Sequence, residues 1–122
     1  MLNFNSVMIS SEDPKALAEF YKSVFQKAVD WSGGDFVGFQ VGDGNLVIGP
    51  HDKVHGKCSS PERIILNFET SDVAGEAERI KGLGAKVIAE PYQPDEAETM
   101  WIATFADPDE NYFQLVSPME GK

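Results

Sequence analysis

The sequence predicts an α+β domain made of two βαβββ halves, and three observations support this prediction. First, a strand, an amphipathic helix and three more strands follow one another twice along the chain. Second, Asp13 and Asp72, which are placed to cap the two helices, lie 59 residues apart, whereas Asp43 and Asp109, in the turns before the two last strands, lie 66 apart. Third, a chain of 122 residues with 42% hydrophobic content can bury a core as one domain. We expect a single domain with halves at 1–50 and 62–118.

The first half begins with a strand at residues 4–10, where apolar and polar side chains alternate loosely. Asp13 and Pro14 then mark the start of a helix, because Asp caps helices and Pro is tolerated in the first turn. Apolar residues recur at helical spacing after this start. Three short strands follow at 28–31, 35–41 and 45–49, with glycine-containing turns between them. The apolar residues that recur on one face of the predicted helix are Leu17, Phe20, Tyr21, Val24 and Phe25.

The second half repeats this order after a polar, proline-bounded linker at residues 50–61. A strand at 63–70 precedes a helix that starts at Asp72 and ends before Gly84, a residue suited to follow a helix end. Strands are predicted at 86–89, 100–105 and 111–116. An extra polar stretch at 92–99 accounts for the seven-residue difference between the two spacings.

Charge and cysteine content restrict the partners that we expect. Twenty acidic and 10 basic residues give a formal charge of −10, with no local basic cluster, so nucleic acid is not expected as a partner. We expect neither a leader peptide nor a membrane span, because residues 1–6 lack a basic stretch and no apolar run reaches the length of a span. Cys58 is the single cysteine, which fits a reducing compartment and predicts a cytoplasmic protein.

Three segments of the chain resemble the glyoxalase/bleomycin resistance protein/dioxygenase (vicinal oxygen chelate) superfamily. Residues 11–21 (SEDPKALAEFY) resemble its first helix entry, 78–85 (ERIKGLGA) its second helix exit, and 105–116 (FADPDENYFQLV) its closing turn and last strand. Glu110 departs from this pattern, since the family commonly has glycine there. The resemblance covers essentially the whole chain. It implies that the two modules form a cupped mixed sheet with the helices on its outer face.

The resemblance also indicates where a metal would be bound. Metal-dependent members hold an ion with four side chains, usually His and Glu, from the first and last strands of each half. In each half, one position lies seven residues before the Asp that caps the helix, and the other lies five residues beyond the Asp of the turn before the last strand. These positions are Ser6, Ile48, Ile65 and Gln114. Two isoleucines, a hydroxyl and a carboxamide are a poor donor set for a divalent ion. We therefore expect no metal and no cofactor. His51, His55 and Cys58 could in principle bind zinc, but a solvated linker is the favoured interpretation.

Alternation along the strands predicts which side chains share the concave face of the sheet. This face would combine apolar walls with a few polar groups, as small-molecule pockets do. Trp31 and Trp101 are large enough to stack on a flat ligand, but packing in the core or at a dimer interface is the favoured interpretation. The candidate ligand-binding residues are Ser6, Met8, Ile48, Ile65, Asn67, Glu69, Trp101, Tyr112 and Gln114.

Three functions are compatible with this prediction. The favoured one is a metal-free module that binds a cationic or aromatic small molecule, as the antibiotic-sequestering relatives do, and that forms a homodimer. The first alternative is a metal-dependent enzyme, either a lactoylglutathione-lyase-like lyase or isomerase or an extradiol-type dioxygenase. The second is an interaction or regulatory protein whose site is vestigial. No arrangement of a nucleophile and a base is evident, so we do not expect catalysis.

Overall fold

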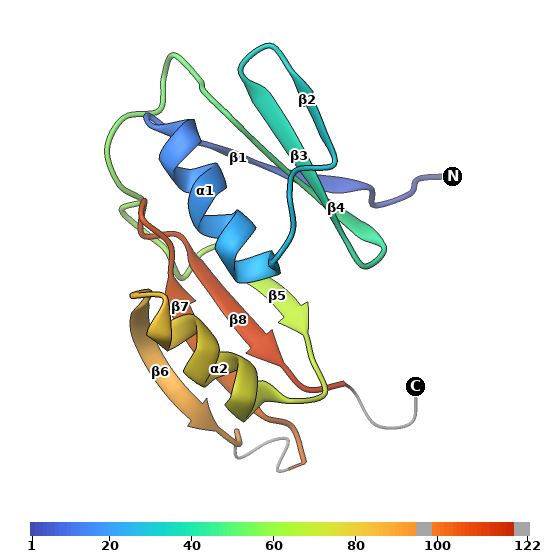
Figure 1. Cartoon of the computed structure of the whole chain (residues 1–122), viewed down its shortest axis with the longest axis vertical. Helices are drawn as coiled ribbons and strands as arrows, with labels where there is room; N and C mark the ends of the chain where they lie inside the picture. Colours follow the sequence, from blue (N-terminus) through green and yellow to red (C-terminus); the bar gives the residue numbers. More distant parts are fainter. Residues whose placement is uncertain (95–98, 119–122) are drawn as a thin grey trace. The chain divides into compact units, whose positions relative to one another are not determined.

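The computed structural model describes residues 1–94 and 99–118. The chain divides into two compact units, Met1–Gly56 (unit 1) and Lys57–Lys122 (unit 2). Each unit contains one helix and a four-stranded mixed sheet (Figure 1). Among the described residues, no helix is long and apolar enough to cross a membrane.

Unit 1 has the element order βαβββ that the sequence predicts. Its strands lie in the order β1-β4-β3-β2, with β1 parallel to β4 and the other pairs antiparallel. The helix packs on β3 and β4. The elements are β1 (Ser6–Ser10), α1 (Pro14–Phe25), β2 (Trp31–Gly33), β3 (Phe36–Val41) and β4 (Gly44–Gly49).

Helix α1 forms where capping and apolar spacing agree. The Asp13 side chain accepts a hydrogen bond from the backbone N–H of Ala16 at 3.2 Å, and Pro14 occupies the first turn. The Tyr21 and Phe25 rings stack 5.4 Å apart, and Phe25 meets Phe39 of β3 edge-on at 5.3 Å. This aromatic contact fixes the helix on one face of the sheet.

Unit 2 repeats the arrangement with the strand order β5-β8-β7-β6. Strand β5 is parallel to β8, and the other pairs are antiparallel. The Asp72 side chain caps the helix through the N–H of Gly75 at 3.0 Å, and Gly84 follows the helix end with a φ of +89°. The elements are β5 (Leu66–Glu69), α2 (Val73–Gly82), β6 (Lys86–Tyr92), β7 (Ile102–Ala106) and β8 (Tyr112–Val116).

Strand β2 overlaps the predicted range 28–31 only at Trp31, and the other strands differ from their predicted ranges at their ends. Strand β1 begins at Ser6 and β5 at Leu66, so Phe4 and Ile64, both expected in strands, lie outside them and are exposed. Strand β6 extends to Tyr92, three residues beyond the predicted end, with irregular register against β7. The predicted polar insertion at 92–99 lies partly outside the described residues.

The hairpins before the two last strands have different lengths. Val41 pairs with Gly44, so two residues connect β3 to β4, and Gly42 takes a φ of +59° there. Ala106 pairs with Tyr112, so five residues connect β7 to β8. The two halves therefore reach their last strands through loops that differ by three residues.

Candidate ligand-binding faces of the two sheets

The face of the unit 1 sheet away from α1 carries a row of apolar side chains. Trp31 pairs with Gly38, Gly38 with Val47, and Val47 with Met8, so these four residues form one line across all four strands. Register partners point to the same side of a sheet. Met8 is 61% exposed and Trp31 is 46% exposed. We call this side, with Ser6, Ser10, Phe36, Gln40, Asn45 and Gly49, the open face of unit 1.

Two glycines let aromatic rings lie against this face. A Cβ atom at Gly38 would overlap the indole of Trp31, and one at Gly49 would overlap the ring of Phe36. Each ring thus occupies the space that a side chain would fill. Neither Phe36 nor Trp31 was among the predicted site residues. The sequence signal for these two aromatic residues was the presence of Gly38 and Gly49 inside apolar strands, because a glycine in a strand often marks the close approach of another group.

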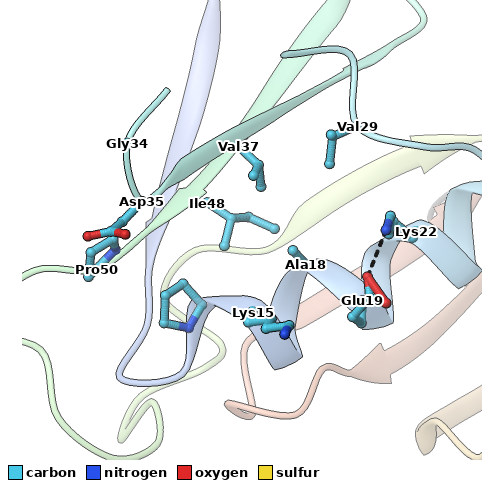
Figure 2. Close-up of a pocket in the computed structure, with 11 residues that line it drawn as sticks. Lys15, Ala18, Glu19, Lys22, Val29, Gly34, Asp35, Val37, Ile48 and Pro50 are labelled. Atoms are coloured by element: carbon cyan, nitrogen blue, oxygen red, sulfur yellow. Dashed lines mark hydrogen bonds and ion pairs between the residues drawn. The ribbon is translucent and has the colours of Figure 1, made fainter. Parts of the chain in front are cut away.

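The predicted position of Ile48 on this face is wrong. Ile48 pairs with Ile9 and Val37, which belong to the opposite side of the sheet, and it is 0% exposed. Figure 2 shows Ile48 and Val37 pointing toward α1, near Ala18. Val47 takes the predicted place on the open face. Eight residues separate Gly38 from its partner Val47, whereas nine separate Thr104 from its partner Gln114. The strand is therefore shifted by one residue relative to its counterpart, which reverses its faces.

The corresponding face of unit 2 is more polar. Asn67 pairs with Gln114, and Gln114 with Thr104, in a row across β5, β8 and β7. The Gln114 side-chain amide donates to the Thr104 hydroxyl oxygen at 3.1 Å. Glu69 lies two residues beyond Asn67 on the same side, and it is exposed. The structure therefore brings Asn67, Glu69 and Gln114 together as predicted. We call this side of β5, β7 and β8 the open face of unit 2.

The remaining predicted residues lie at the margins of their sheets. Ser6 is exposed at the start of β1. Ile65 immediately precedes β5 and is half-buried, and Tyr112 is half-buried at the start of β8, opposite Ala106. Trp101 immediately precedes β7. Its backbone N–H donates to the Ser117 hydroxyl oxygen at 2.9 Å, and its backbone carbonyl accepts from the backbone N–H of Ser117 at 3.0 Å. The binding role of these residues remains a prediction.

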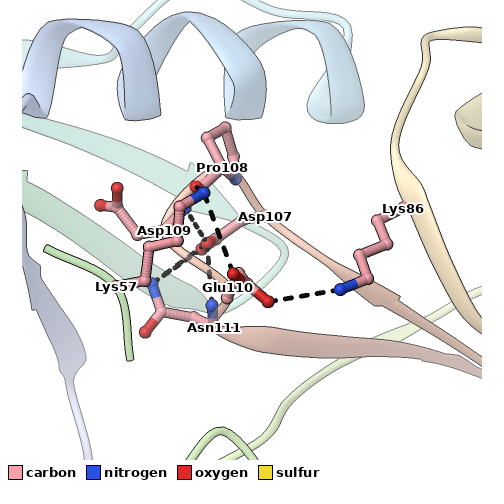
Figure 3. A network of polar contacts seen from close by, with 7 residues as sticks. All are labelled: Lys57, Lys86, Asp107, Pro108, Asp109, Glu110 and Asn111. Carbon is pink, nitrogen blue, oxygen red and sulfur yellow. Dashed lines mark hydrogen bonds and ion pairs between the residues drawn. The ribbon is translucent and has the colours of Figure 1, made fainter. Parts of the chain in front are cut away.

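The closing turn before β8 is held by a buried carboxylate. Asp107 is 4% exposed and accepts hydrogen bonds from the N–H groups of Asp109 and Asn111, both at 2.9 Å, and from the Asn111 side chain (Figure 3). Glu110 takes a φ of +62°, so the left-handed conformation favoured by glycine is kept with a glutamate. Its carboxylate lies 3.3 Å from the Lys86 ammonium and 3.9 Å from that of Lys57.

The side chains at the expected metal positions do not suit a divalent ion. In unit 1 these positions hold the Ser6 hydroxyl and an aliphatic side chain, whether the strand position is taken as Val47 or as the core-facing Ile48. In unit 2 they hold Ile65 and the Gln114 amide, which already donates a hydrogen bond to Thr104. A divalent ion needs carboxylate, imidazole or thiolate donors. No group of three or more His, Cys, Asp or Glu side chains within residues 1–94 and 99–118 could hold a metal ion.

The histidines of the linker interact with neighbouring polar groups. His51 Nδ1 accepts from the N–H of Lys53 at 3.1 Å and lies 3.3 Å from the Asp52 carboxylate. His55 Nδ1 lies 3.9 Å from the carboxylate of Glu12, and Cys58 is exposed. These contacts agree with the solvated linker that was the favoured interpretation.

Comparisons with known proteins agree with this fold. The family described as glyoxalase-like domain matches residues 6–116, which is nearly the whole chain. The chain belongs to this family. A comparison with curated protein sequences found no match.

Solved structures show the same fold at low sequence identity. One is a glyoxalase/bleomycin resistance protein/dioxygenase family enzyme from Burkholderia phytofirmans PsJN, with a TM-score of 0.78 and 20% identity over 97% of this chain and 100% of that chain. Another, a glyoxalase/bleomycin resistance protein/dioxygenase from Nocardioides, has a TM-score of 0.81 and 14% identity, covering 100% and 87%. TioX from Micromonospora sp. ML1 has a TM-score of 0.73 and 13% identity, covering 97% and 100%. The predicted superfamily and fold class are thus confirmed for this glyoxalase-like domain.

Proposed function

We propose that this glyoxalase-like domain binds a flat aromatic small molecule on the open face of unit 1, without a metal and without catalysing a reaction. The observation that carries the proposal is the row in which the Trp31 indole lies over Gly38, followed by Val47 and Met8. An exposed aromatic ring beside apolar side chains is a surface on which a planar ligand can stack. The names of the structural relatives, which include bleomycin resistance, support a small organic ligand.

The net negative charge of the whole protein favours a cationic ligand over a neutral one. The residues of the open face of unit 1 are uncharged, so they select for shape and apolar character. The formal charge of −10 raises the local concentration of cations at low ionic strength.

Two dyes of similar shape and different charge test the proposal. Acridine is neutral and proflavine is cationic at neutral pH, and each is titrated while melting temperature and dye fluorescence are measured. We expect both to bind, with proflavine tighter at low salt and the difference reduced at about 0.15 M salt. Replacing Trp31 by Ala should weaken both about tenfold, because the stacking surface is lost.

Matched variants separate loss of the ring from general damage. Gly38→Ala should also weaken binding, since the new Cβ displaces the indole, whereas Gly33→Ala adds a Cβ in open space and should not. Leu83→Ala removes an apolar side chain that is likewise 46% exposed, at the end of α2, and should have no effect. Equal binding by the Trp31→Ala and Leu83→Ala variants would contradict the proposed face. Stoichiometric metal in the purified protein would instead favour the metal-dependent alternative.

A further inference from the structure

A pocket in unit 1 lies on the opposite side of the sheet from the open face. It is formed between α1 and strands β3 and β4, with the β2–β3 turn at one end (Figure 2). Its volume of about 460 Å³ is within the range of small-molecule sites. The proposed stacking face shares no residue with it, so the pocket would be a second site.

The wall of the pocket is apolar. Ala18 of α1 and Ile48 of β4 are buried, and Val29 and Val37 are half-buried around them. Pro14 and Pro50 add two rigid apolar rings. A hydrocarbon group placed here would leave water and contact aliphatic carbon from the helix and from the sheet.

Four charged side chains lie around this wall, and two of them already form a pair. The Lys22 ammonium lies 2.9 Å from the Glu19 carboxylate, and this hydrogen bond and charge hold the pKa of Glu19 below its usual value of 4.5. The charge of Lys15 contributes weakly to the same lowering of the Glu19 pKa, but within the part of the chain that the structure describes neither Lys15 nor Asp35 forms a side-chain hydrogen bond or ion pair. Asp35 lies beside Pro50 at the end formed by the β2–β3 turn, and Lys15 projects from the helix (Figure 2).

We propose that the pocket binds a small amphipathic zwitterion. Its apolar body contacts Ala18, Val29 and Val37, its carboxylate meets the Lys15 ammonium, and its ammonium meets the Asp35 carboxylate. A ligand with no net charge is also favoured over a simple anion, because the protein carries a formal charge of −10 and repels anions at long range. Short apolar peptides and apolar amino acids belong to this chemical class.

Leucyl-leucine is a suitable probe, and two derivatives serve as matched controls. N-acetyl-leucyl-leucine lacks the ammonium and leucyl-leucine amide lacks the carboxylate, while both keep the apolar body. Methyl NMR of the whole chain then locates binding. We expect leucyl-leucine to shift the methyl signals of Ala18, Val29 and Val37 and to leave that of Val47, on the other side of the sheet, in place. Each derivative should bind about threefold to fivefold more weakly.

Variants on the helix distinguish the proposed contacts from general charge effects. Lys15→Gln should weaken leucyl-leucine about threefold to fivefold and abolish the advantage of the free carboxylate, and Asp35→Asn should do the same for the free ammonium. Lys22→Gln removes the same charge from the same helix at a side chain that Glu19 already pairs, so affinity should be unchanged. The inference is overturned if leucyl-leucine shifts no pocket methyl, if Val47 shifts instead, or if the Lys15 and Lys22 variants bind equally.

Discussion

Glu110 shows how a single residue can depart from a family pattern while the backbone stays the same. The structure keeps the left-handed conformation at this position, with a φ of +62°, although the glutamate has a Cβ that disfavours it. Asp107 and Asn111 hold the surrounding turn through several hydrogen bonds, and Glu110 adds exposed ion pairs with Lys57 and Lys86. The sequence showed only that Glu110 replaces the glycine of the family pattern, because a sequence gives the residue type and not the backbone angle.

Replacing Glu110 by Gly should stabilise the protein. Relief of the left-handed strain should raise the free energy of unfolding by about 1 kcal/mol, whereas the two exposed ion pairs contribute little. Urea unfolding measures the difference. Glu110→Gln is the control, since it removes the ion pairs and keeps the strain, and it should be no more stable than the parent. A glycine variant less stable than this control would show that the turn depends on the side chain.

At the scale of elements, residue periodicity predicted most of the architecture and loop length limited the rest. Both helices start at the predicted Asp caps, and all eight strands occur in the predicted order. The error at Ile48 arose because the turns around Asp43 and Asp109 look alike in sequence, yet eight residues separate the paired Gly38 and Val47 and nine separate the paired Thr104 and Gln114. A one-residue shift exchanges the two faces of a strand. Cross-strand register is a tertiary property, which short motifs do not determine.

Two glycines of α2 should respond in opposite ways to alanine. Gly82 has open space around the position of a Cβ, so Gly82→Ala should raise the free energy of unfolding by about 0.5–1 kcal/mol through helix propensity. At Gly75 the new Cβ would overlap the Asp72 carboxylate that caps the helix. Loss of this cap costs about 1 kcal/mol and should cancel the gain. Thermal or urea unfolding of both variants tests this, and equal stabilisation would mean that the cap can move without cost.

The ion pair of α2 should contribute to stability at neutral pH and lose its contribution in acid. Arg79 binds the Glu76 carboxylate through two hydrogen bonds of 3.0 and 2.9 Å, and this pairing lowers the pKa of Glu76 from its usual value of 4.5. A lowered pKa in the folded state means that the stabilisation is complete above pH 4.5 and disappears as the pH falls through the folded value. Glu76→Gln should therefore lose up to about 0.5 kcal/mol at neutral pH. Urea unfolding of the parent and the variant should show this difference at neutral pH and none in acid.

At the scale of the whole molecule, charge is the dominant feature of the composition. Twenty acidic residues against 10 basic ones leave an excess negative charge that the ion pairs of the surface do not neutralise. Like charges repel one another in the compact state more than in the unfolded chain. The same excess explains why cationic ligands and not nucleic acids were expected from composition. The predicted homodimer remains a prediction, which sedimentation or light scattering can test.

Added salt should stabilise the protein because it screens this repulsion. Raising ionic strength from about 0.01 M to about 0.15 M shortens the screening length from about 30 Å to about 8 Å. We expect the free energy of unfolding to rise by up to about 1 kcal/mol over this range. Urea unfolding in both NaCl and KCl separates screening from effects of a particular ion. A fall in stability with salt would mean that the attractive surface pairs outweigh the net repulsion.

The unequal hairpins have a practical consequence for protein engineering. If the halves were superposed on their closing motifs, a designer copying a side chain from position 114 would choose position 48 and insert a polar group beneath α1. The equivalent outward position is Val47, as the pairing of the strands indicates. A histidine or glutamate grafted at Val47 would lie between Met8 and Gly38, on the face of the sheet away from α1.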